Sequence, residues 1–160
     1  MNINNILKSP LLPISLFGFV VYLLSKKSTN LPLSTSSQID DLINNDDLVK
    51  TSIEKGNYKS YNNETFISFA DKLHTALNKS NVDEPKVFQI LNKINNDTDF
   101  IILNRTFGVR ELDIFWRTSW SSQNLTMKQM LSKQMDTNEK NTINTDFSNK
   151  GLTFSIYNIK

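Results

Sequence analysis

The sequence predicts an all-α fold: a compact bundle of five or six short helices with an N-terminal hydrophobic helix and a short extended C-terminal tail. Between about residue 65 and residue 149, apolar side chains recur at the i, i+3, i+4, i+7 spacing of amphipathic helices. Asn, Asp, Pro and Gly stand at the edges of these stretches, where helices begin and end. Near the N-terminus, residues 9–25 carry no charge and contain the densest apolar run of the chain.

The centre of the predicted bundle is residues 81–108, which the pattern divides into two short helices. Asn81 is the expected N-cap of the first, Glu84 completes a capping box, and Pro85 falls in the first turn, where a missing N–H is tolerated. Its buried stripe is Val87, Ile90, Leu91 and Ile94.

The second central helix is expected to be capped by Asp97. Gly108 is expected just past its end, where a positive φ is needed. Its apolar surface is Phe100, Ile101, Leu103 and Phe107.

The flanking segments supply further helices. One is predicted upstream over residues 65–78, with the apolar stripe Phe66, Phe69, Ala70, Leu73 and Leu77. A fourth is predicted downstream on Leu112, Phe115, Trp116 and Trp120.

The C-terminal part predicts two more helical pieces. The first has Asn124 as its expected cap and Leu125, Met127, Met130, Leu131 and Met135 as its apolar residues. The second runs over residues 137–149 and stops at Gly151, after which residues 152–157 form a short strand or an extended tail.

Residues 9–25 are interpreted as a single membrane span. About 17 helical residues cover roughly 25 Å of the roughly 30 Å thickness of the hydrocarbon core. A cleaved secretory signal and a hydrophobic helix buried against protein are the two alternatives. The predicted membrane anchor is Leu11, Leu12, Ile14, Leu16, Phe17, Phe19, Val20, Val21, Tyr22, Leu23 and Leu24.

Three regions follow from this division. Residues 1–27 are the N-terminal hydrophobic or transmembrane segment, residues 28–63 are a polar linker and partly ordered arm, and residues 64–160 are the helical domain with its tail.

Composition argues against several classes of function. The formal net charge is +2 and the lysines alternate with acids, so the footprint of a nucleic-acid-binding surface is missing. His74 is the single histidine and is expected to pack at the edge of an apolar stripe. A glycosidase-like pair among Glu54, Glu64 and Asp71 would need a cleft, yet these acids lie in or beside the polar arm. We therefore expect no enzymatic activity, no cofactor and no small-molecule substrate.

Two of the three arginines and one tryptophan are the candidates for partner contacts. Arg105, Arg110 and Arg117 lie within thirteen positions, and Arg110 is expected to bind carbonyls at the end of the helix closing at Phe107 or to pair with an acid such as Asp99 or Asp113. This structural role is favoured over partner recognition. Trp120, Arg110 and Arg117 are the predicted partner-binding residues.

Residues 69–120 resemble the first four helices of an annexin repeat, with residues 81–84 (NVDE) at the position of the interhelical loop motif. The chain more closely resembles small proteins of bacteriophages that infect Bacteroidetes. These have an N-terminal apolar segment, a helical domain of this pattern, and an F-G-x-R element like residues 107–110. The annexin calcium loop uses glycines, and residues 79–82 contain none, so no metal is expected.

This resemblance implies a non-enzymatic phage structural protein. Its apolar helix would sit in a membrane or pack into the virion, and its helical domain would contact capsid or other virion proteins. The expected location is the virion, and membrane lipid is an expected partner. The alternative is a membrane-anchored protein outside the virion that acts at the envelope of the infected bacterial cell, in lysis or envelope modulation.

Overall fold

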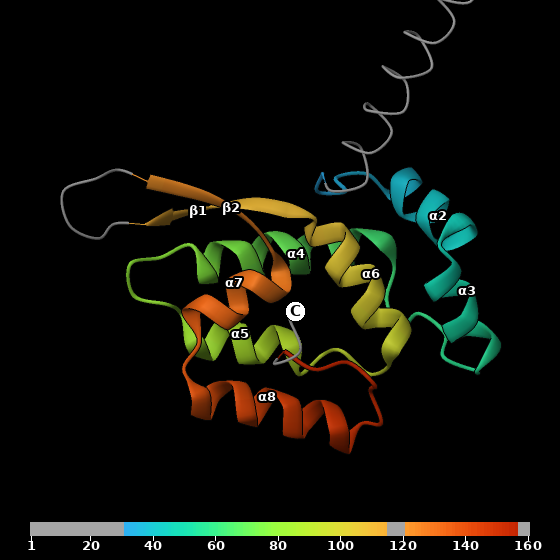
Figure 1. Cartoon of the computed structure of the whole chain (residues 1–160). Coiled ribbons are helices and arrows are strands. Elements are labelled where there is room, and N and C mark those ends of the chain that lie inside the picture. The colour runs from blue at the N-terminus through green and yellow to red at the C-terminus, as the bar shows by residue number, and fades with distance from the viewer. Residues whose placement is uncertain (1–30, 115–120, 157–160) are drawn as a thin grey trace, which may run out of the picture. The chain divides into compact units, whose positions relative to one another are not determined.

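A computed structural model describes residues 31–114 and 121–156 (Figure 1). The chain divides into two units, Met1–Leu31 and Pro32–Lys160, and the elements below belong to the second. They are the helices α2 (Ser36–Asn45), α3 (Asp47–Glu54), α4 (Asn63–Leu77), α5 (Glu84–Leu91) and α6 (Asp97–Phe107), the strands β1 (Val109–Ile114) and β2 (Ser121–Thr126), and the helices α7 (Met127–Gln134) and α8 (Thr137–Asn149).

The core is built around α4, which packs against α5 and α6, as Figure 1 shows. The stripes predicted for these three helices are all buried, so the predicted core of this part of the chain is confirmed. Phe66, Phe100, Phe107 and Phe147 are among its largest fully buried side chains. The described part of the unit is therefore mostly helical.

The predicted fourth helix is wrong, and with it the strictly all-α fold. Residues 109–114 form β1, which pairs antiparallel with β2 in a two-stranded sheet. Alternate residues face opposite sides of a strand, so Leu112 is buried while Glu111 and Asp113 are exposed. The helical spacing of Leu112, Phe115 and Trp116 had suggested a helix. Phe115, Trp116 and Trp120 lie outside the described residues.

Two side chains at the C-terminal end of α4, those of His74 and of the capping residue Asn78, bind the edge of β1 that β2 leaves unpaired. The Asp113 N–H donates to Asn78 Oδ1 at 2.7 Å, and Asn78 Nδ2 donates to the Asp113 carboxylate at 3.0 Å. His74 Nε2 lies 2.8 Å from the Glu111 carbonyl oxygen. The sheet is thereby fixed to the helix that organises the core.

Two helices, α2 and α3, lie within the segment assigned to the linker and arm. A capping box of Thr35 and Gln38 begins α2, and Asp46 caps α3 by accepting from two backbone N–H groups. Ile39 and Val49 are fully buried. This segment is thus more ordered than the sequence indicated, because a few apolar side chains fix it to the core.

Three predicted caps are each displaced by one or two residues. Asp83, not Asn81, caps α5, because the Asp83 N–H bonds to the Ala76 carbonyl and turns the chain there. Asn96 caps α6 in place of Asp97. Leu125 and its predicted cap lie in β2, and α7 begins after Thr126.

The last helix and the tail agree with the prediction. α8 spans the predicted residues, Gly151 adopts φ +76°, and residues 152–156 then run without regular structure. Leu152 and Ile156 are buried, and Phe154 stacks on Phe100 with ring centroids 4.8 Å apart. The tail is therefore part of the core.

No helix among residues 31–114 and 121–156 is long and apolar enough to cross a membrane. The predicted anchor, residues 9–25, lies outside the described residues.

Candidate functional site

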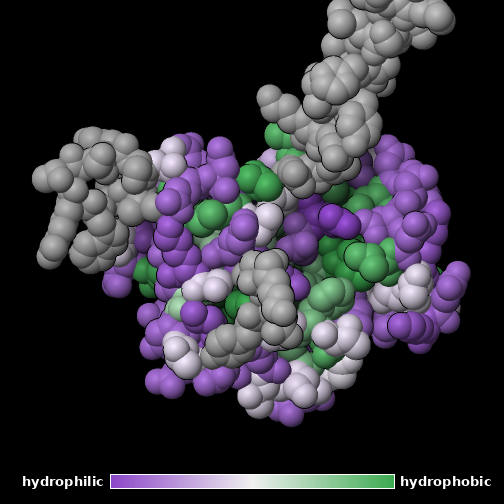
Figure 2. Space-filling model, viewed as in Figure 1, coloured by the Kyte–Doolittle hydropathy of each residue, from purple (hydrophilic) through white to green (hydrophobic). Residues whose placement is uncertain are grey.

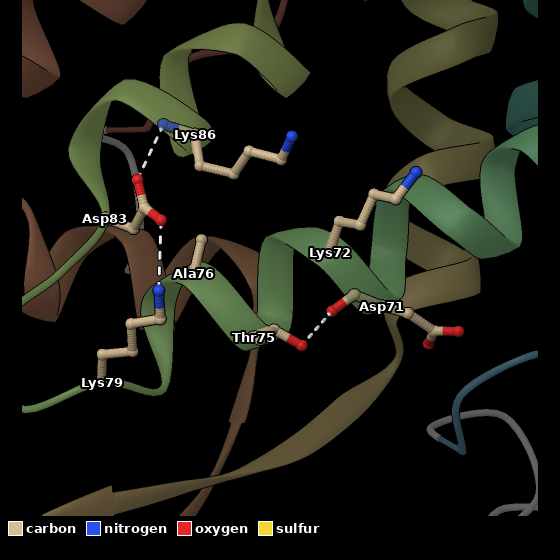
Figure 3. A pocket seen from close by; sticks show the side chains of 7 residues that line it. All are labelled: Asp71, Lys72, Thr75, Ala76, Lys79, Asp83 and Lys86. Atoms are coloured by element: carbon tan, nitrogen blue, oxygen red, sulfur yellow. Dashed lines mark hydrogen bonds and ion pairs between the residues drawn. The ribbon is translucent and has the colours of Figure 1, made fainter.

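A groove lies between α4 and the start of α5, with a volume of about 410 Å³ (Figure 3). We call it the lysine groove. It is lined by Asp71, Lys72, Thr75, Ala76, Lys79, Asp83 and Lys86.

Both acids of the lysine groove are already paired with a cation. Asp71 Oδ1 lies 2.8 Å from the guanidinium of Arg110, and its carboxylate points away from the groove in Figure 3. Asp83 pairs with Lys79 at 3.1 Å and also accepts from the Lys86 backbone N–H. The Lys79 ammonium, hydrogen-bonded to Asp83, lowers the pKa of that carboxyl.

Two cations of the groove are left without an acid. Lys86 Nζ donates to the neutral amide of Gln89 at 2.8 Å. Within residues 31–114 and 121–156, neither Lys72 nor Lys86 forms an ion pair with a carboxylate. The groove therefore presents excess positive charge, which suits an anionic ligand.

A second hollow of about 330 Å³ lies where α2, α3 and α6 meet. Its lining is more apolar, and Figure 2 shows hydrophobic surface between α6 and α3. Tyr58, one of its lining residues, is 68% exposed. The residues lining this second hollow are Asp40, Ile43, Asn44, Ile53, Tyr58, Lys59, Thr98 and Ile102.

Among the predicted partner-binding residues, Arg110 is held inside the domain. Arg110 Nε donates to the Phe107 carbonyl at 3.0 Å, as predicted, and the guanidinium lies 5.1 Å from the centroid of the Phe107 ring. The acid that pairs with it is Asp71, not Asp99 or Asp113. Arg117 and Trp120 lie outside the described residues.

The carboxylates considered for catalysis have separate surroundings. Glu54 is exposed and lines neither hollow. Glu64 accepts a hydrogen bond from the Ser36 hydroxyl, which lowers the pKa of Glu64.

His74 is half-buried with its ring edge against Phe107, in keeping with the packing role predicted for it. In the described part of the chain no three or more acids or histidines cluster so as to hold a metal ion.

The sequence analysis did not identify the lysine groove. Lys72, Lys79 and Lys86 recur every seven residues, but Lys72 lies in α4, Lys79 in the bend after it and Lys86 in α5. The spacing therefore could not predict the groove, because the position of α5 relative to α4 depends on packing.

Comparison with protein-family models, with curated proteins and with solved structures finds no match for this chain.

Proposed function

We propose that the protein is a non-enzymatic tether and a structural component of a phage particle. Its apolar segment, residues 9–25, holds the helical unit at a membrane or inside the virion, and the unit contacts other virion proteins. The observation that carries this proposal is the short connection between the apolar segment and the first anchored residue of the fold.

That residue is Leu33, whose N–H donates to the Thr106 carbonyl at the end of α6 at 3.0 Å. Three residues further on, the Ser36 carbonyl accepts from Asn63 Nδ2 at 3.0 Å. Only the seven residues 26–32 separate Ser25, at the end of the apolar run, from Leu33, so eight Cα-to-Cα steps join the two. A chain of that length spans at most about 28 Å, so the unit would remain close to whatever holds its apolar segment.

A role in contacting proteins is supported by the second hollow. It combines apolar walls with an exposed tyrosine, and tyrosine is enriched at the energetic centres of protein interfaces. Trp120 and Arg117 remain further candidates for this contact.

The setting is tested by fractionating purified phage particles, with and without detergent extraction, and detecting the protein by mass spectrometry. Recovery with the lipid fraction is the expected result. Retention in the lipid-free shell would mean that residues 9–25 are buried against protein. Absence from the particles would overturn the virion proposal in favour of the envelope of the infected cell.

The anchor is tested separately by placing charges in the apolar run. Phe19→Asp with Leu23→Asp should release the protein from membranes in a flotation assay, because a central aspartate opposes insertion by about 2.5–3.5 kcal/mol. Ser28→Asp with Ser34→Asp adds the same charge outside the run and should leave flotation unchanged. Equal flotation of both variants would refute the membrane anchor.

A further inference from the structure

We propose that the lysine groove binds the phosphate groups of anionic phospholipids. This inference rests on the proposed membrane tether and names a second partner for the same protein. The binding groups are the ammonium groups of Lys72 and Lys86, and Lys79 contributes when its pair with Asp83 opens.

The first reason is the uncompensated charge of the groove. Asp71 is turned away toward Arg110, and one Asp83 oxygen lies 3.1 Å from Lys79. In Figure 3, Lys79 lies against Asp83, whereas the side chains of Lys72 and Lys86 extend away from both acids. An anion in the groove would thus meet two ammonium groups without first displacing an acid.

The second reason is the chemistry of the cations. Lysine ammonium groups have three donors each and bind phosphate as point charges, and arginine binds phosphate or carboxylate through bidentate contacts. The described arginine next to the groove, Arg110, is already bound to Asp71. The N-terminus of α5 is also occupied, because the Lys86 N–H is capped by Asp83. The lysine side chains are therefore the groups that would bind.

The third reason is reach. The unit Pro32–Lys160 contains 129 residues, and a domain of that length has a radius of gyration of about 14 Å. A connector of at most about 28 Å would let most of its surface contact the lipid that holds the apolar segment. Tethering also raises the effective concentration of headgroups, so weak contacts become significant. Each lysine at an anionic surface strengthens association roughly fivefold.

The experiment is amine footprinting of the full chain in lipid nanodiscs. Discs of phosphatidylcholine alone are compared with discs that also contain anionic phosphatidylglycerol. Lysines are acylated with a water-soluble reagent and quantified by mass spectrometry. We expect anionic discs to slow acylation of Lys72, Lys79 and Lys86 several-fold relative to Lys50 and Lys55 of the α3 region. Equal slowing of all five lysines would overturn the proposal.

Paired variants make the result specific to the groove. In Lys72→Gln with Lys86→Gln, the remaining Lys79 should lose its protection by anionic lipid. In the matched control Lys50→Gln with Lys55→Gln, Lys79 should keep it. Persistent protection of Lys79 in the groove variant would contradict the assignment.

Two further measurements separate the possible failures. Inorganic phosphate added to neutral discs tests a soluble source, and protection by phosphate without protection by anionic lipid would overturn the lipid assignment. Retention of the chain in neutral discs tests the anchor alone, since those discs carry no net charge. Loss from neutral discs would refute the tether, whereas retention without selective protection would refute only the groove.

Discussion

Asp99 is fully buried at the start of α6 and joins three parts of the chain. Its carboxylate accepts from the Ser60 N–H at 2.8 Å and from the Asn95 N–H at 3.1 Å, while its own N–H donates to Asn96 Oδ1. Each hydrogen bond to this carboxylate contributes to stability, although Ser60 and Asn95 are themselves exposed. This single side chain therefore holds the loop before α4 against the turn before α6.

We expect Asp99→Ala to lower the free energy of unfolding by about 0.5–1.5 kcal/mol for each hydrogen bond lost, because Ser60 and Asn95 are exposed and water can replace the acceptor. Asp99→Asn retains one acceptor oxygen and should lose less. Urea denaturation of both variants measures the difference. Equal losses would show that the carboxylate acts through its charge and not through the two hydrogen bonds.

Glu84 in the first turn of α5 gives the stability a pH dependence. The neighbouring Glu139 carboxylate, hydrogen-bonded to Glu84, raises the pKa of Glu84, and charge repulsion adds to the effect. The folded protein thus binds this proton more tightly than the unfolded chain does. The stabilisation that comes from tighter proton binding by Glu84 is fully present below the ordinary pKa of glutamate. It is lost as pH rises through the raised pKa of Glu84.

Glu84→Gln removes this titration. We expect the stability of the variant relative to the wild type to increase as pH rises through the raised pKa, as measured by urea denaturation over a pH series. Glu54→Gln, at an exposed position on α3, is the matched control and should show no such trend. A constant difference between Glu84→Gln and the wild type over the series would contradict the prediction.

At the scale of the elements, the turn from α6 into β1 depends on Gly108. Its backbone has φ +60° and ψ −141°, a region that is strained for residues with a side chain. We expect Gly108→Ala to destabilise the fold by about 1–3 kcal/mol. Gly108→Asn should do no better, because the left-handed region that asparagine tolerates requires a positive ψ. Wild-type stability of the asparagine variant in thermal melts would show that the turn can relax.

The helices that build the core, α4, α5 and α6, could be predicted and the sheet could not, for a physical reason. The spacing of Val87, Ile90 and Leu91 is enough to predict their helix, because every helical hydrogen bond joins residues four positions apart. The partner of β1 is β2, and the pairing of Leu112 with Gln123 joins residues eleven positions apart, which no short sequence pattern specifies. Over six residues, the alternation of β1 was too short to outweigh a helical pattern that continued to Trp116.

At the scale of the whole molecule, the candidate sites were predicted less well than the core. The contact of Arg110 with the Phe107 carbonyl follows from a spacing of three residues, so the sequence could indicate it. Its ion pair with Asp71 and the convergence of Lys72 with Lys86 depend on how α4, α5 and β1 pack. Such tertiary arrangements leave no local pattern.

The backbone hydrogen bond between Leu33 and Thr106 has a consequence for how the protein responds to force. Any pull on the N-terminal segment reaches the fold first at this one backbone hydrogen bond, and then at α2 and α3. These two short helices should detach before α4, because each has a single buried apolar residue, Ile39 in α2 and Val49 in α3. The ion pair of Asp46 with Arg105 at 3.1 Å adds a polar contact with α6. Unravelling residues 33–57 would add at most about 85 Å of contour length.

Under force, the protein would then lengthen by partial unfolding of α2 and α3 while the core around α4 stays folded. Optical-tweezer pulling from the N-terminus should show a first extension of about this size, followed by a second, larger step at higher force. Ile39→Ala should lower the force of the first step only. A single step that unfolds the whole unit at once would rule out this behaviour.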